Sequence, residues 1–106
     1  MNTATYFHRT TKRAARAILR HGFKDADGSY LTNILHKGVW ISDVPLDANE
    51  GPPGGVLLSV KIDGRRVRAF EWIEKGKPYR EFLVPASILN KYGITRLAEE
   101  GKDGAP

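Results

Sequence analysis

The chain has 106 residues, no cysteine and a formal net charge of +5 at pH 7, from 17 Lys and Arg against 12 Asp and Glu. This length suits one domain with its own core, and the lack of cysteine excludes thiolate catalysis, thiolate metal sites and disulfides. The sequence has no run of about 18 apolar residues that could span a membrane, and its basic N-terminal stretch is unlike a signal peptide. We therefore expect a cytoplasmic protein.

A strand followed by a helix is predicted at the start of the chain. Residues 4–8 combine β-branched and aromatic side chains without a breaker, which is typical of a strand. A hydroxyl of Thr10 or Thr11 then caps a helix over 12–21, where small and aliphatic residues recur at helical spacing. Gly22 follows at the position where a left-handed residue usually ends a helix.

The same N-terminal region is strongly basic. Residues 1–24 contain six Lys and Arg and no Asp or Glu, and Arg13, Arg16 and Arg20 fall on one face of the predicted helix. Such a stripe attracts phosphate-bearing ligands or nucleic acid at long range. An ordinary solvated helix face is the alternative interpretation.

The middle of the chain alternates between irregular and extended segments. Residues 24–37 show no clean period, and because a loop of this length in a compact domain is often functional, we expect a mobile segment that covers a ligand cleft. A strand is predicted over 39–42, and the Pro- and Gly-rich residues 45–55 indicate turns.

The second half predicts more strands and a short helix. Residues 56–62 form the clearest strand pattern, whereas 65–74 fit a helix or a strand equally well. A strand over 79–84 precedes a helix of one or two turns over 86–90, opened by a proline, and 94–97 can add an edge strand.

These elements predict one small α+β domain over residues 1–98, mostly β, with one main helix after the first strand. Residues 99–106 are polar and Gly-rich, so we expect a flexible tail.

Three segments on different strands carry the candidate chemistry, and in chain order they offer a histidine, an aromatic residue and a glutamate. They read FHRT at 7–10 with ILRHGF at 18–23, then GVWISD at 38–43, then YREFLV at 79–84. Their order and contexts resemble the ADP-ribosyltransferase superfamily, in the His-Tyr-Glu branch to which the poly(ADP-ribose) polymerases belong. The similar family patterns are a strand ending in His-Gly-Ser/Thr, a helix ending in Ile-Leu-x-x-Gly-Leu, and strands reading Gly-Ile-Tyr-Phe-Ala-Asp and Asn-Glu-Tyr-Ile-Val.

The resemblance implies NAD as the substrate, no metal, and a β-rich core of two packed antiparallel or mixed sheets. It also implies Glu81, His8 and Trp40 as the catalytic set. Cleavage of the nicotinamide–ribose bond passes through an oxocarbenium-like transition state, which the Glu81 carboxylate would stabilise. His8 would hydrogen-bond a ribose hydroxyl, and Trp40, at the family's tyrosine position, would stack on nicotinamide.

Arg9, Thr10 and Ser42 are further candidates for contact with NAD, with the backbone of residue 9 clamping the carboxamide. Arg9 departs from the family, because a glycine there lets nicotinamide approach a bare backbone. Its side chain must swing out or meet a phosphate. Tyr79 is neither Glu nor Gln, which argues against the arginine-modifying toxin branch with its Glu-x-Glu pair at the catalytic glutamate.

Each candidate also has an ordinary structural interpretation. A histidine at the end of a strand usually satisfies local polar groups, and a tryptophan such as Trp40 in an apolar strand usually belongs to the core. Glu81 could simply pair with Arg80 or with a basic residue on a neighbouring strand.

The first interpretation is an NAD-dependent mono-ADP-ribosyltransferase-like enzyme whose protein or nucleic-acid acceptor docks on the basic helix face. The alternatives are an enzyme like the NAD-dependent RNA 2′-phosphotransferases of the same superfamily, and a non-catalytic basic module that binds nucleic acid or an acidic partner. If the enzyme interpretation holds, His8, Trp40 and Glu81 should converge on one cleft, bordered by the loop over 24–37.

Overall fold

The computed structural model describes residues 3–30, 34–46 and 55–98. The strands are β1 (Thr3–Thr10), β2 (Ala26–Tyr30), β3 (Ile34–Ser42), β4 (Val56–Asp63), β5 (Glu71–Trp72), β6 (Glu81–Val84) and β7 (Ile94–Leu97). The helices are α1 (Lys12–His21) and α2 (Ala86–Tyr92), and two short 3-10 turns are η1 (Gly64–Arg66) and η2 (Arg68–Phe70).

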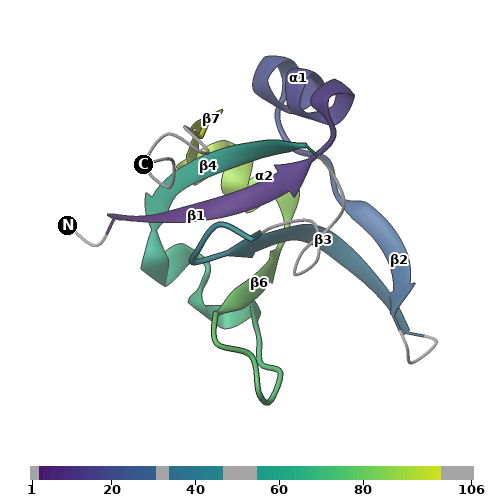
Figure 1. The fold of residues 1–106 in the computed structure, drawn as a ribbon, viewed down its shortest axis with the longest axis vertical. Coiled ribbons are helices and arrows are strands. Elements are labelled where there is room, and N and C mark those ends of the chain that lie inside the picture. The colour runs from purple at the N-terminus through teal and green to yellow at the C-terminus, as the bar shows by residue number, and fades with distance from the viewer. Residues whose placement is uncertain (1–2, 31–33, 47–54, 99–106) are drawn as a thin grey trace.

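Six strands form one antiparallel sheet in the order β5-β6-β3-β1-β4-β7. β2 pairs with the first part of β3, and this hairpin projects from the rest of the molecule (Figure 1). The α+β class and the main helix after the first strand agree with the prediction. The resemblance implied two packed sheets, whereas the described strands make one sheet with a hairpin extension.

Helix α1 forms as its capping residues predict. Thr11 Oγ1 accepts a hydrogen bond from the backbone N–H of Ala14 at 3.1 Å. Gly22 ends the helix at a φ of 91° and donates its N–H to the carbonyl of Ile18 at 2.8 Å. In the described part of the chain, no helix is long and apolar enough to cross a bilayer.

The prediction of a loop over 24–37 is wrong, because most of this segment is the β2–β3 hairpin. Its polar and Gly-containing sequence has no strand period of its own, and the ladder between the two strands, from Ala26 opposite Gly38 to Tyr30 opposite Ile34, supplies the structure. β3 therefore begins at Ile34, five residues before the predicted strand over 39–42.

Gly38 marks the point where β3 changes partner from β2 to β6. Its φ is 150°, and a Cβ built there would lie 3.1 Å from the carbonyl oxygen of Val84 and from the Leu83 side chain. Only a residue without a side chain fits both the conformation and the close approach.

The segment 65–74, which the sequence left open between helix and strand, is neither a full helix nor a long strand. It forms η1, η2 and the two-residue β5. Asp63 begins the first turn, its Oδ1 accepting from the N–H of Arg65 at 2.9 Å, and Val67 between the turns is fully buried. α2 runs two residues beyond the predicted 86–90, and β7 is the expected edge strand.

Residue pairing defines two faces of the sheet, because paired side chains share a face and neighbours along a strand alternate. One face, the core face, is packed against Ala86 and Leu89 of α2. Its buried strand residues include Tyr6, Val39, Ile41, Val60, Ile62, Phe82 and Val84. The opposite, outer face carries Phe7, Ser42 and Glu81, which lie side by side across β1, β3 and β6.

Candidate functional site

The three segments that carry the resemblance lie on three adjacent strands. His8 is in β1, Trp40 is in β3 between β1 and β6, and Glu81 begins β6. Residues of one site must lie on neighbouring parts of the backbone, and the strands of these three residues meet that condition.

The register separates His8 from the other two side chains. Phe7 is opposite Ser42, and Ser42 is opposite Glu81, so these three share the outer face. Trp40 lies two residues before Ser42 and faces the same way, whereas His8 follows Phe7 and faces the core side. The expected convergence on one cleft therefore does not occur for the side chains: Trp40 and Glu81 come together, and His8 lies across the sheet from them.

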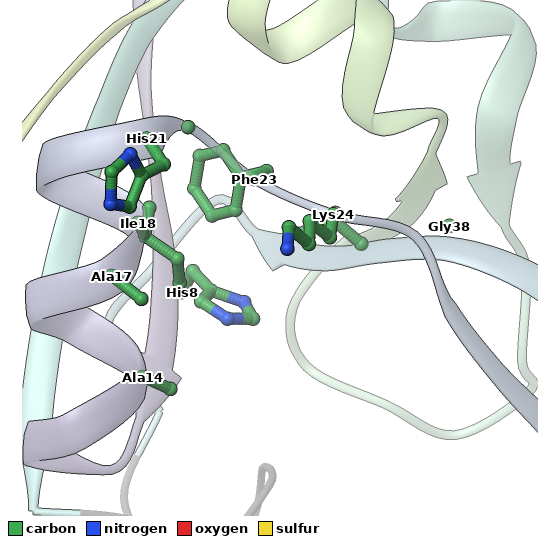
Figure 2. Close-up of a pocket in the computed structure, with 10 residues that line it drawn as sticks. His8, Ala14, Ala17, Ile18, His21, Phe23, Lys24 and Gly38 are labelled. Atoms are coloured by element: carbon green, nitrogen blue, oxygen red, sulfur yellow. The ribbon is translucent and has the colours of Figure 1, made fainter.

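On the core face, His8 lines a cavity of about 310 Å³. Figure 2 shows its ring between α1 and Lys24, beneath the ring of Phe23. Most of the wall formed by α1 is apolar, with Ala14, Ala17 and Ile18 facing the space, and His21 lines it at the end of the helix. An apolar cavity with a few polar groups is the usual form of a small-molecule site.

The hydrogen bonds of His8 define which of its nitrogens is available. Nδ1 lies 2.7 Å from the backbone oxygen of Trp40. Because a carbonyl only accepts, Nδ1 carries the proton of the neutral ring, and Nε2 keeps a lone pair. Nε2 has no protein partner among the residues that the structure describes. It is therefore available to accept a hydrogen bond from a ligand.

His8 is held neutral and in place by its surroundings. Burial lowers the pKa of the imidazole below its ordinary value of 6.5, against the opposing effect of the bond to Trp40. The ring also packs edge-to-face on Phe23, with the centroids 5.4 Å apart. A neutral, oriented acceptor suits a hydroxyl donor such as a ribose.

On the outer face, the Glu81 carboxylate is largely covered, with 16% of its side chain exposed. Its Oε1 accepts a hydrogen bond from Lys77 Nζ at 2.9 Å, and this bond raises the pKa of the lysine. Lys77 also lies 3.4 Å from the more exposed Glu74. The structural interpretation of Glu81 predicts an ion pair with Arg80 or with a basic residue on a neighbouring strand. The partner is instead Lys77, four residues earlier in the chain, since Arg80 binds Glu71.

Two tryptophans flank Glu81. Trp40 meets Trp72 edge-to-face, with centroids 5.4 Å apart, and Trp72 is paired with Glu81 across β5 and β6. Trp72 was not among the predicted site residues because it lay in the ambiguous segment 65–74. Its signal in the sequence is that it is the only other tryptophan of the chain.

Two of the other predicted NAD contacts, Arg9 and Ser42, hydrogen-bond to the chain after β3. Arg9 is buried and its Nε donates to the carbonyl of Leu46, so its side chain does not swing out into solvent. The Ser42 hydroxyl donates to the carbonyl of Val44 at 2.7 Å. Thr10 ends β1 opposite Val56 and is half-buried.

The space beside Glu81 is small in this conformation. Arg9, Trp40, Ser42 and Glu81 line one depression of about 10 Å³, which is room for about one water molecule. A ring of the size of nicotinamide fits there only if side chains that line the depression move.

The basic face of α1 is exposed. Arg13, Arg16 and Arg20 make no ion pair with any residue that the structure describes. The helix borders the His8 cavity, so a ligand there lies beside a positively charged surface.

Comparison with protein-family models, with curated proteins and with solved structures gives no match to this chain. Among the described residues, no group of three or more His, Asp or Glu side chains could hold a metal ion.

Proposed function

We propose that the chain is an NAD-dependent mono-ADP-ribosyltransferase in which Glu81 is the catalytic carboxylate. The observation that carries the proposal is this covered carboxylate at the start of β6, beside the indoles of Trp40 and Trp72 on the same face of the sheet. One strand, β3, separates it from the strand of the histidine.

The separation of His8 and Glu81 requires a ligand that reaches both faces. β1 and β3 share one register pair in the described chain, Phe7 with Ser42. We call the boundary between these strands the seam. NAD has two riboses. In the proposed binding mode the dinucleotide crosses the end of the seam, so that a hydroxyl of one ribose donates to His8 Nε2 and the other ribose, which carries nicotinamide, lies beside Glu81.

The residues on the outer face suit bond cleavage at that ribose. The bond between the anomeric carbon and the nicotinamide nitrogen breaks, and its electron pair leaves with nicotinamide. The Glu81 carboxylate stabilises the positive charge that develops on the ribose. The acceptor's nucleophile then bonds to the anomeric carbon and loses its proton. Trp40 supplies a flat surface for the leaving ring.

Glu81→Gln tests this function, because it keeps the shape and removes the charge. Release of nicotinamide from NAD should fall by roughly 10²-fold or more, while NAD affinity changes far less. Glu74→Gln is the matched control: it also removes a carboxylate near Lys77, but an exposed one outside the strands. Its rate should stay within about twofold of the unmodified protein, as for surface changes generally.

A basic binding module is the second candidate, and one observation favours it. Glu81 is tied to Lys77 and the space beside it is nearly full, whereas the arginines of α1 are exposed and unpaired within the described chain. If the purified protein releases no nicotinamide with any acceptor, and Glu81→Gln alters nothing, the module replaces the enzyme as the conclusion.

A further inference from the structure

A second large cavity, of about 350 Å³, opens on the core side of the sheet at the end away from α1. Its position follows from the register, because Thr10, next to α1, pairs with Val56, and Thr3 pairs with Asp63, next to η1. Among the described residues, it shares no lining residue with the His8 cavity or with the depression at Glu81.

The floor of this cavity is aromatic and rigid. Tyr6 and Phe82 pack edge-to-face with centroids 5.2 Å apart, and Tyr6 is 7% exposed. The Tyr6 hydroxyl has no hydrogen-bond partner among the described residues. Burial is the main cause that raises its pKa, and nearby carboxylates add to this against the opposing effect of Arg80. The hydroxyl therefore keeps its proton at neutral pH and can donate a hydrogen bond.

Three arginines surround the floor, and they are not equivalent. Arg65 is bound to Asp63 at 2.8 Å, and Arg80 is bound to Glu71 through two nitrogens at 2.6 and 2.9 Å. Arg68 has no ion pair with any described residue. It is therefore the one guanidinium of the three that no carboxylate of the described chain already binds.

The nearby carboxylates are all occupied as acceptors. Asp63 and Glu71 take the guanidinium groups of Arg65 and Arg80, and Asp43 accepts the backbone N–H of Arg80 at 3.0 Å. A guanidinium has five N–H groups, and each of these pairs leaves several unused. The cavity consequently holds an excess of donors over acceptors.

We propose that this cavity binds a small organic oxyanion, a carboxylate or a phosphate ester, through Arg68 and the Tyr6 hydroxyl. Oxyanions are the partners that a guanidinium fork binds most strongly. The volume exceeds the roughly 30 Å³ share of one water molecule about tenfold, so a ligand larger than an inorganic anion fits, with its body against the parts of Tyr6 and Phe82 that line the cavity. This site is independent of the proposed enzymatic function.

Titration calorimetry with three probes tests the site: phenyl phosphate, benzoate and inorganic phosphate. Saturable binding of either aromatic anion, tighter than inorganic phosphate, is expected. The better of the two identifies whether the ligand is a phosphate ester or a carboxylate. Arg68→Gln should weaken binding by about tenfold or more, and Tyr6→Phe, which keeps the ring, by about threefold to tenfold.

Arg66→Gln is the matched control. It removes the same charge two residues away, but its guanidinium lies over the Tyr92 ring, 3.9 Å from the centroid, and does not line the cavity. Its affinity should stay within about twofold of the unmodified protein. Arg68 is exposed, so its substitution should leave the fold intact, as circular dichroism would verify.

Two results would overturn the site. One is the absence of saturable binding of all three probes at millimolar concentration. The other is an equal loss of affinity in Arg66→Gln and Arg68→Gln, which would mean attraction to the general positive charge of the protein. Glu81→Gln should bind the probes unchanged, so failure here is distinct from failure of the proposed enzyme.

Discussion

Two substitutions of His8 separate its structural bond from its ligand-facing nitrogen. The amide nitrogen of asparagine can replace Nδ1 and keep the bond to the Trp40 carbonyl, whereas it has no group at the place of Nε2. Glutamine reaches the place of Nε2 and loses the bond. Both variants lose the ring contact with Phe23, so this loss cancels when they are compared.

The magnitudes follow from the single bond at 2.7 Å in a half-buried setting. His8→Gln should be less stable than His8→Asn by about 0.5–1.5 kcal/mol, the net value of one hydrogen bond. For a chain of this size, that corresponds to a midpoint of thermal unfolding lower by roughly 2–12 °C. NAD affinity should show the opposite order, with His8→Asn weaker by about twofold to tenfold.

Thermal unfolding followed by circular dichroism measures the first quantity, and calorimetric titration with NAD measures the second. Equal midpoints for the two variants would refute the assignment of Nδ1 as the structural donor. Equal NAD affinities, with both variants folded, would refute the assignment of Nε2 as the ligand contact.

Two further predictions concern Gly38 and pH. Gly38→Ala should lower the free energy of unfolding by about 1–3 kcal/mol, because the residue has a positive φ and its Cβ would lie 3.1 Å from the Val84 carbonyl oxygen. Gly55→Ala is the control, because a Cβ there meets nothing within 4 Å. Equal urea midpoints for the two variants would contradict this prediction. Arg65 lowers the pKa of Asp63 from 3.8 to about 2. The stabilisation of the fold by the Asp63–Arg65 pair is therefore complete above pH 4 and is lost as the pH falls towards 2. His8 also makes the fold less stable in acid, but at a higher pH. Because its pKa is lowered in the folded protein, the imidazole of the unfolded chain takes up a proton first, and stability falls as the pH drops below 6.5. Acid titrations of unfolding should lose the lower component in Asp63→Asn and the upper one in His8→Asn, and unchanged curves would contradict the linkage.

The parts of the fold that depend on local chemistry could be predicted from the sequence. The Thr11 cap and Gly22 fix both ends of α1 within the chain itself, and the prediction of that helix is confirmed. The β2–β3 hairpin could not be predicted from the sequence. Residues 26–30 have no strand pattern of their own and form a strand only by pairing with residues 34–38 of β3.

The position of the candidate site shows the same limit more sharply. Which strands carry His8, Trp40 and Glu81 follows from the sequence, but the face that each occupies depends on register. A slip of one residue would move His8 to the face of Glu81. The observed register, with Phe7 opposite Ser42, places Tyr6 in the core. Burial of Tyr6 depends on residues far away in the sequence, so the register could not be read from the local pattern.

The single register pair at the seam also has a mechanical consequence. In the described chain it joins two parts of the sheet, β1-β4-β7 and β5-β6-β3. Side-chain hydrogen bonds add to this link, among them those of His8 to the Trp40 carbonyl and of Arg9 to the carbonyl of Leu46, which follows β3. A ligand that donates to His8 Nε2 polarises the ring and strengthens its bond to the peptide of Trp40. If NAD binds as proposed, its contact with His8 on one face of the sheet would strengthen the link to the backbone of Trp40, whose side chain lies on the other face.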